Sequence, residues 1–300
     1  MSFNLTAARY GKDKVRVFRV VKNGNWHEVV EYNVCTLLEG DIETSFTKAD
    51  NTVVVATDSI KNITYYLAKT SPHILHPERF ALHLGSHIVG KYAHIHKATV
   101  SIEQLRWHRI AINGQDHTHS FYRDGDDKRT TEVEVDATAG KDNMVAKVTS
   151  GIADLLVIKT TGSAFENFVR DEYTTLAEVT DRIFSTSVDL RYSFIPKTLD
   201  PNNLGNFDYD KVASAARAIT LEIFATDESA SVQATLYKMA ERLLAEHGDV
   251  EHVAYTLPNK HYLAVDMKYI GIDNLTPSAA EVFCPVAAPS GLISATVSRK

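Results

Sequence analysis

The fold is decided near the start of the 300-residue chain by two strand-like stretches, VRVFRVV at 15–21 and a longer one at 26–38. The first alternates apolar and basic side chains, which is the pattern of a half-buried strand. The second is rich in β-branched and aromatic residues, which favour strands. Between them, Asn23 and Gly24 form a typical hairpin signal. These residues therefore predict a long antiparallel hairpin.

Helices and further strands follow in the first half of the chain. One helix is predicted from about 60 to 69, with Thr57, Asp58 and Ser59 as candidate N-caps. A second is predicted from 78 to about 92, with Pro77 as its first residue. Strands then return at three places, 98–112, 117–122 and 130–135. A tight turn at Asn113 and Gly114 separates the first two of them.

The second half repeats this order of elements. The predicted strands and helices are, in order, strands at 153–159 and 183–195, helices at 209–225 and 229–246, and strands at 253–257, 262–269 and 292–297. The polar stretch 137–143 is the best linker, so we expect a first domain over 1–140 and a second over 141–300. Long antiparallel strands with helices on one face predict an α+β architecture. Because open sheet edges invite pairing, we also expect oligomerisation through those edges.

Composition excludes several classes of protein. Apolar residues make up 44% of the chain and charged residues 23%, which is close to the average for globular proteins and excludes disorder, collagen and coiled coil. A net charge of −6 speaks against a nucleic-acid partner, and no stretch approaches the length of a membrane helix. The two cysteines, Cys35 and Cys284, are too few for a disulfide framework and indicate a reducing compartment.

Thirteen histidines raise the question of a metal site. Three pairs have the spacing that puts both rings on one face of a helix or strand: His83 and His87, His94 and His96, and His117 and His119. A zinc site needs three or four converging ligands, and only pairs are present, so we expect no metal. Glycine-rich phosphate loops and the Gly-x-Ser-x-Gly nucleophile elbow are also missing from the sequence.

Four short polar clusters remain as candidates for a functional site. They are the stretch 10–12, the stretch 56–58 at a strand-to-helix junction, the segment 155–182, and the stretch 257–262, which we expect to join two strands. Helix amides at such a junction can bind an anion. Each cluster also has an ordinary structural interpretation as a cap, a core side chain, a surface ion pair or a turn. Composition and spacing alone therefore predict only an oligomeric α+β protein.

Together, these clusters resemble motifs of the urate oxidase (uricase) family, and the likeness covers essentially the whole chain. The matching motifs are YGK (10–12), VATDSIKN (55–62), LLVIKTTGSAF (155–165) followed by Phe168, Tyr173, Leu176 and Arg182, SVQAT (231–235), and LPNKHY (257–262). The resemblance implies a tandem of tunnelling-fold (T-fold) domains, each with four antiparallel strands and two helices. Two subunits would close a barrel of sheets, and two barrels would stack into a homotetramer around a central tunnel.

The resemblance also implies how substrate is bound. Arg182 would grip the planar urate anion with a bidentate pair of hydrogen bonds. Gln233 and the backbone of Val232 would hold the opposite edge of the ring, and Phe165 would stack on its face.

Thr57 and the backbone of Asp58 would bind the five-membered ring from a neighbouring subunit. Each active site would then lie at a subunit interface, and a monomer would be inactive.

Catalysis without a cofactor is a further implication. Urate, oxygen and water would give 5-hydroxyisourate and hydrogen peroxide, a step of purine catabolism. Lys12, Thr57 and His261 would form a proton relay, in which neutral Lys12 takes a proton through the Thr57 hydroxyl and His261 passes protons to solvent. Asn259, together with Thr57, would hold oxygen or water above the ring.

Two alternatives stay open at this point. The chain could be another T-fold enzyme acting on a pterin or guanine ring, although such relatives mostly anchor the ring with a glutamate and several use zinc. It could also be a non-catalytic purine-binding member of the fold.

The expected location depends on the source. Eukaryotic uricases carry a peroxisomal tripeptide, whereas this chain ends in Ser298, Arg299 and Lys300. Its first residues lack the pattern of a secretory signal. We expect a peroxisomal protein if the source is eukaryotic and a cytoplasmic one otherwise.

Overall fold

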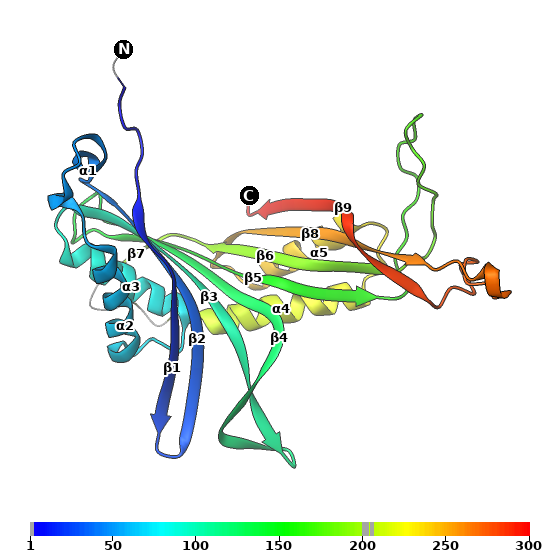
Figure 1. Cartoon of the computed structure of the whole chain (residues 1–300), viewed down its shortest axis with the longest axis horizontal. Coiled ribbons are helices and arrows are strands. Elements are labelled where there is room, and N and C mark those ends of the chain that lie inside the picture. The colour runs from blue at the N-terminus through cyan, green and yellow to red at the C-terminus, as the bar shows by residue number, and fades with distance from the viewer. Residues whose placement is uncertain (1–2, 200–203, 205–206) are drawn as a thin grey trace. The chain divides into compact units, whose positions relative to one another are not determined.

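A computed structural model describes residues 3–199, 204 and 207–300 (Figure 1). The chain divides into two compact units. Unit 1 comprises Met1–Ile152, Arg191–Ser214 and Asp249–Glu251, and unit 2 comprises Ala153–Leu190, Ala215–Gly248 and His252–Lys300. The two units interleave along the sequence, because several elements contribute residues to both. The expected domain boundary near 140 stays a prediction.

Unit 1 is built on four long antiparallel strands that neighbour one another in chain order. They are β1 (Tyr10–Asn23), β2 (Trp26–Gly40), β3 (Ile95–Ile112) and β4 (Gln115–Asp136). Both predicted hairpin turns are present, and Gly24, Asn113 and Gly114 take the positive φ that such turns require.

The strands predicted at 117–122 and 130–135 form one continuous strand, β4. Between them the register against β3 shifts, from Arg123 opposite Trp107 to Lys128 opposite Leu105. Side chains still connect the strands there, because Arg106 of β3 donates to Asp124 (2.9 Å) and Asp127 (2.6 Å).

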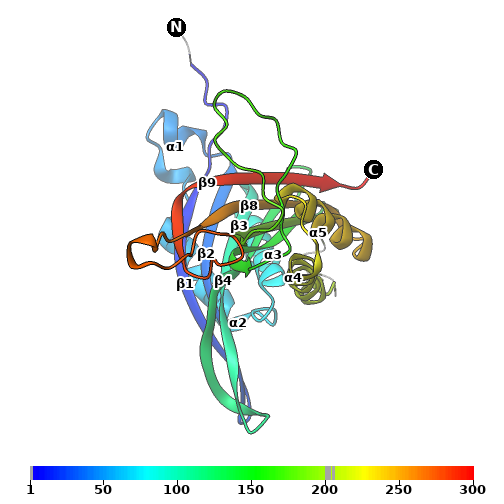
Figure 2. The same cartoon turned by 90° about the vertical axis from the view of Figure 1, so that its right-hand side faces the viewer.

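Two helices pack on one face of the unit 1 sheet, as Figure 2 shows: α2 (Thr57–Thr70) and α3 (Pro77–Lys91). Helix α3 begins at Pro77, as predicted. Helix α2 begins three residues earlier than predicted, with Ala56 at the N-cap. Thr57 and Asp58 are therefore in its first turn and do not cap it, a position in which the negative Asp58 is favourable. The short elements α1 (Glu43–Thr47) and η1 (Asn51–Val53) were not predicted.

Unit 2 contains further strands of the same antiparallel sheet. Its strands are the last part of β5 (Val145–Lys159), the first part of β6 (Phe184–Phe194), β8 (Val250–Ala264) and β9 (Phe283–Ser298), in that order across the sheet. Helices α4 (Tyr209–Thr226) and α5 (Val232–Glu246) supply its helical layer. The short β7 (Lys197–Thr198) pairs with the start of β5 in unit 1, and η2 (Lys268–Ile270) follows β8.

The stretch 257–262 lies inside strand β8, which corrects the expectation that it joins two strands. Pro258 misled the prediction because proline is rare within a sheet. Here the strand tolerates it beside a β-bulge, where the register against β9 shifts between Asn259 and His261. Bulges re-aim side chains, so the bulge affects where two of the predicted site residues point.

Candidate functional site

The segment after β5 is joined by backbone hydrogen bonds to the segment before α5. Ala164 N donates to Ser229 O (2.8 Å), and Ser229 N donates to Gly162 O (3.0 Å). The chain can turn there because Gly162 adopts φ +76°, a conformation that glycine takes without strain. The predicted Phe165 segment therefore lies next to the N-terminus of α5.

Arg182 is attached to the same segment. Its backbone N donates to Ser163 O (2.8 Å), and its guanidinium carbon lies 5.2 Å from the centre of the Phe165 ring. Phe165 in turn stacks on Phe168, with ring centres 4.9 Å apart. Burial lowers the pKa of Arg182, yet an arginine stays charged at neutral pH because its ordinary value is so high. The result is a cation beside an aromatic face, which is suited to a planar anion.

The N-terminus of α5 supplies the next two predicted residues. Ser231 caps the helix, its Oγ accepting from Ala234 N (3.1 Å), so Val232 and Gln233 are in the first turn. Backbone N–H groups of a first helical turn lack acceptors within the helix and can bind a ligand. Unit 2 thus brings together Phe165, Arg182 and the helix end that carries Val232 and Gln233.

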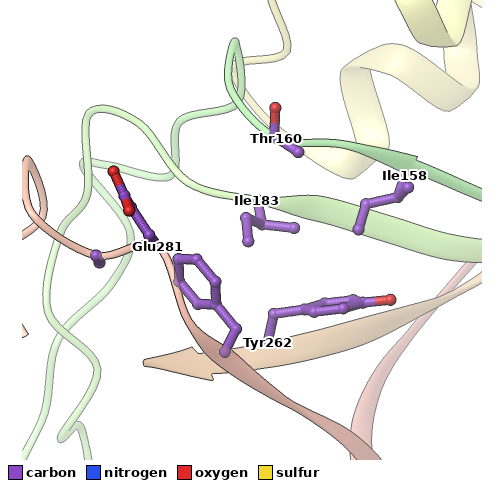
Figure 3. A pocket seen from close by; sticks show the side chains of 7 residues that line it. Ile158, Thr160, Ile183, Tyr262 and Glu281 are labelled. Carbon is purple, nitrogen blue, oxygen red and sulfur yellow. The ribbon is translucent and has the colours of Figure 1, made fainter. Parts of the chain in front are cut away.

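A hollow of about 540 Å³ in unit 2 lies between the end of β5, the residues before β6 and β9, and strand β8, and none of the predicted site residues is among those that line it. Ile158 of β5 and Ile183 line one side, opposite Tyr262 of β8, as Figure 3 shows. Ile183 directly follows Arg182, and Tyr262 directly follows His261. The half-buried His261 and Asn259 flank the bulge of β8 described above.

Lys12, Thr57 and Asp58 belong to unit 1. Lys12 lies at a β-bulge in β1, where the register against β2 shifts between Lys12 and Val15. The Tyr10 hydroxyl accepts the Val55 N–H (2.7 Å) and so ties the start of β1 to the segment before α2. This bond links the strand that carries Lys12 to the helix end that carries Thr57.

Asp58 points its carboxylate along its own helix. It accepts from Lys61 Nζ (2.6 Å) and Asn62 Nδ2 (3.0 Å). The hydrogen bond from Lys61 and the charge of that lysine lower the pKa of Asp58, and the charge of Lys12 adds to the effect. The carboxylate is thus engaged by two side chains of its own helix.

Sequence reasoning missed the polar residues that hold these segments in place. Asp181 accepts from Thr161 Oγ1 (2.6 Å) and Gly162 N (2.8 Å). Asp227 accepts from Thr235 Oγ1 (2.7 Å), and Ser229 bridges to the Phe165 segment. In the sequence, Asp181 directly precedes Arg182, and Asp227 and Ser229 come shortly before the SVQAT motif. Such adjacency does not indicate a contact.

Histidines do cluster at the hairpin ends of unit 1. The rings of His117 and His119 lie 4.6 Å apart, and His27 lies 5.8 Å from His119. Within residues 3–199, 204 and 207–300, however, no group of three or more histidine, cysteine, aspartate or glutamate side chains is placed to hold a metal ion. Nor is any helix of that part of the chain long and apolar enough to cross a membrane.

Fold and site together define an antiparallel α+β protein that brings an arginine, a phenyl ring and a helix N-terminus close to one another. Comparisons with known proteins identify the family. The family model described as Uricase matches residues 8–134 and 148–294. The uricase of Emericella nidulans is 49% identical over 99% of this chain and 97% of its own, and that of Aspergillus flavus is 47% identical over 98% and 96%.

Among solved structures, the crystal structure of uricase from Arthrobacter globiformis superposes with a TM-score of 0.88 at 35% identity, covering all of this chain and 96% of that one. The chain belongs to the uricase family. The predicted fold class, α+β with T-fold sheets and helices on one face, is confirmed by the same comparison.

Proposed function

We propose that this chain is a urate oxidase that converts urate, oxygen and water to 5-hydroxyisourate and hydrogen peroxide without a cofactor. The observation that carries the proposal is the contact of Arg182 with Phe165 beside the N-terminus of α5, in a chain of the uricase family. The relatives named above are all uricases, so an activity on pterin or guanine rings has no support from them.

Substrate binding would use the unit 2 cluster. Arg182 donates two hydrogen bonds to one edge of the urate anion, and the Gln233 amide with the Val232 N–H binds the other edge. Phe165 stacks on the ring and restricts its tilt. The Arg182 and Phe165 geometry, at 5.2 Å, supports this arrangement because the same arginine flanks the ring that would cover the substrate.

The reaction would need protons to move and oxygen to be held. Loss of a second proton makes urate electron-rich enough to reduce oxygen, giving a hydroperoxide from which water displaces peroxide. Lys12 takes that proton through the Thr57 hydroxyl, His261 connects the relay to solvent, and Asn259 holds oxygen or water above the ring with Thr57.

We further propose a homotetramer with its active sites at subunit interfaces, where Thr57 and the backbone of Asp58 bind substrate held by another subunit. Exposed apolar side chains on the strands support an assembly: Leu156 and Leu292 are 62% and 69% exposed. Large exposed apolar patches mark protein–protein interaction sites.

Peroxisomal location is the alternative that we favour, because the chain is more similar to the two fungal uricases than to the bacterial one. Imaging of a fluorescent fusion with the chain's own C-terminus left free would check it.

The test of the function follows urate by its ultraviolet absorbance and peroxide in parallel, with a chelator present. One peroxide per urate, unaffected by the chelator, is the expected result. Arg182→Ala should lower kcat/KM more than about a hundredfold, because losing charge-assisted hydrogen bonds costs about 3 kcal/mol or more. Arg182→Lys keeps the positive charge but loses the bidentate geometry of the guanidinium. Its kcat/KM should be nearly as low as that of Arg182→Ala. Full activity of Arg182→Ala would refute the assignment.

A further inference from the structure

Asp181 directly precedes Arg182, and its carboxylate faces the turn that leads to Phe165. It accepts hydrogen bonds from Thr161 Oγ1 (2.6 Å), Gly162 N (2.8 Å) and, at longer range, Ser163 N (3.5 Å). A carboxylate has two oxygens that only accept, so it can satisfy several donors of one turn at once.

The bonds between the two segments run in both directions. Asp181 accepts from the turn, while the Arg182 backbone N donates to Ser163 O (2.8 Å). Further along, Phe165 exchanges backbone hydrogen bonds with Val179, at 2.8 and 3.1 Å. These bonds hold the segment that carries Phe165 alongside the segment that carries Arg182. At one end of the paired segments, the Asp181 carboxylate adds the bonds from Thr161 and Gly162.

The same turn also contacts the N-terminus of α5. Gly162 and Ala164 are bonded to Ser229, which precedes the capped end carrying Val232 and Gln233. A turn that moves would therefore disturb three binding elements together: the arginine, the phenyl ring and the helix end.

We propose that Asp181 is a positioning residue of the urate site, which sets the separation of the Arg182 guanidinium from the Phe165 ring and from α5 through the turn at 161–163. The proposal rests on the substrate-binding roles proposed above. Asp181 does not touch substrate itself. It acts by keeping one geometry of the binding groups populated, so its loss affects substrate binding more than chemistry or folding.

The first test replaces the carboxylate with an amide. In Asp181→Asn, the amide oxygen can still accept from Gly162 N, but the amide nitrogen is a donor and can no longer accept from Thr161 Oγ1. We expect KM for urate to rise about tenfold or more, kcat to stay within about twofold, and the unfolding temperature to change little. Asp181→Glu restores a carboxylate and should recover part of the affinity.

A matched control uses a carboxylate with the same kind of backbone bonds elsewhere in unit 2. Asp273 accepts from Leu275 N and Thr276 N, both at 3.1 Å. Asp273→Asn should leave KM unchanged. Because hydrogen bonds lower the pKa of Asp181, with the bond from Thr161 foremost, the carboxylate is ionised at neutral pH, and the KM defect should be constant from about pH 6 to 9.

A second variant covers the case in which Asp181→Asn does not fold. Thr161→Val removes the hydroxyl that donates to Asp181 at 2.6 Å. It should therefore also raise KM for urate. In the double variant the two effects should not add, because both remove one interaction.

The outcomes separate this inference from the proposed function. If the wild-type protein consumes urate and both variants keep its KM, or lose only stability, the positioning role is wrong and the function stands. If the wild-type protein consumes no urate, the function and the inference fall together.

Discussion

At the scale of single residues, a glycine places the candidate proton acceptor. A Cβ added at Gly11 would lie 1.8 Å from Thr36 O, so only glycine lets β1 approach β2 this closely. The bulge that starts at Lys12 follows at once, and Lys14 takes φ +54° within it. The direction of the Lys12 side chain thus depends on a residue that has no side chain.

Gly11→Ala should therefore destabilise the protein by about 3 kcal/mol and reduce turnover of urate, because β1 must shift away from β2. The control is Gly90→Ala in α3, where an added Cβ meets nothing within 4 Å. Alanine is the better helix former there, so this variant should gain about 0.5 to 1 kcal/mol. Thermal and denaturant unfolding of both variants would check the pair; equal stabilities would contradict the close approach of the two strands.

At the scale of elements, a buried ionic cluster in unit 1 joins β4 to the first turns of α3 and α4. Arg129 of β4 donates to Glu78 (2.7 Å) and to Asp210, and Ser150 donates to Glu78 (2.6 Å). The Glu78 side chain is 0% exposed. A buried charge is costly unless it is paired, so the two helices and the strand depend on one another.

Arg129→Met should destabilise the protein by about 3 to 5 kcal/mol, because it removes the ion-pair partner of the buried Glu78 carboxyl group. Arg242 offers a matched surface control, since it also pairs with two carboxylates, those of Glu222 (3.0 Å) and Glu246 (2.8 Å). Arg242→Met should change stability little, because exposed pairs are screened by water. Similar losses in the two variants, measured by denaturant unfolding, would show that burial is not what makes the cluster important.

The end of β4 gives a prediction about pH. Burial alone would raise the pKa of Asp136, but hydrogen bonds from Lys97 (2.8 Å) and Thr138 outweigh it and hold the pKa at about 2. The folded pKa is below the unfolded value of about 3.9, so this carboxylate stabilises the fold fully above pH 4. That contribution is lost as the pH falls from about 4 to about 2.

Asp136→Asn should accordingly be less stable than the wild-type protein at pH 7, and the difference should vanish near pH 2. Asp142→Asn, at an exposed carboxylate in the stretch 137–143 that follows β4, is the control and should match the wild-type protein throughout. Unfolding measured across this range checks both. A difference that persists at pH 2 would mean that the charge of Asp136 is not its source.

At the scale of the whole molecule, the proposed assembly makes two measurable claims. The mass in solution should be four times 33.3 kDa, about 133 kDa, by sedimentation. Specific activity should fall on dilution once subunits separate, because the active sites would be shared between chains.

Mixing two inactive variants tests whether the sites are shared. Thr57→Ala and Arg182→Ala should each be nearly inactive alone, but coexpression should restore up to about a quarter of wild-type activity, since random tetramers contain some sites with both residues intact. The control is a single chain with both substitutions, which should gain nothing when coexpressed with either variant. No recovery in tetramers shown to be mixed would place all site residues in one chain.

The sequence by itself determined the class of fold and most of the elements. Alternation in 15–21, the turns at Asn23 and Asn113, and Pro77 at the start of α3 are local signals, because each depends on backbone preferences of a few neighbouring residues. The ordered motifs also predicted the family, which the comparisons bear out. Local signals failed where a distant partner decided. Pro258 stays in β8 because β9 pairs with it, and Arg106 of β3 binds the acidic side chains of the polar part of β4.

Only the tertiary structure decided which residues meet. That Asp181 holds the turn before Phe165, that Ser229 connects this turn to α5, and that Arg129 joins Glu78 to Asp210 follow from contacts between segments far apart in the chain. Sequence patterns report which residues share a face of one element. They do not report which elements pack together, because packing is set by the shape and burial of the whole core.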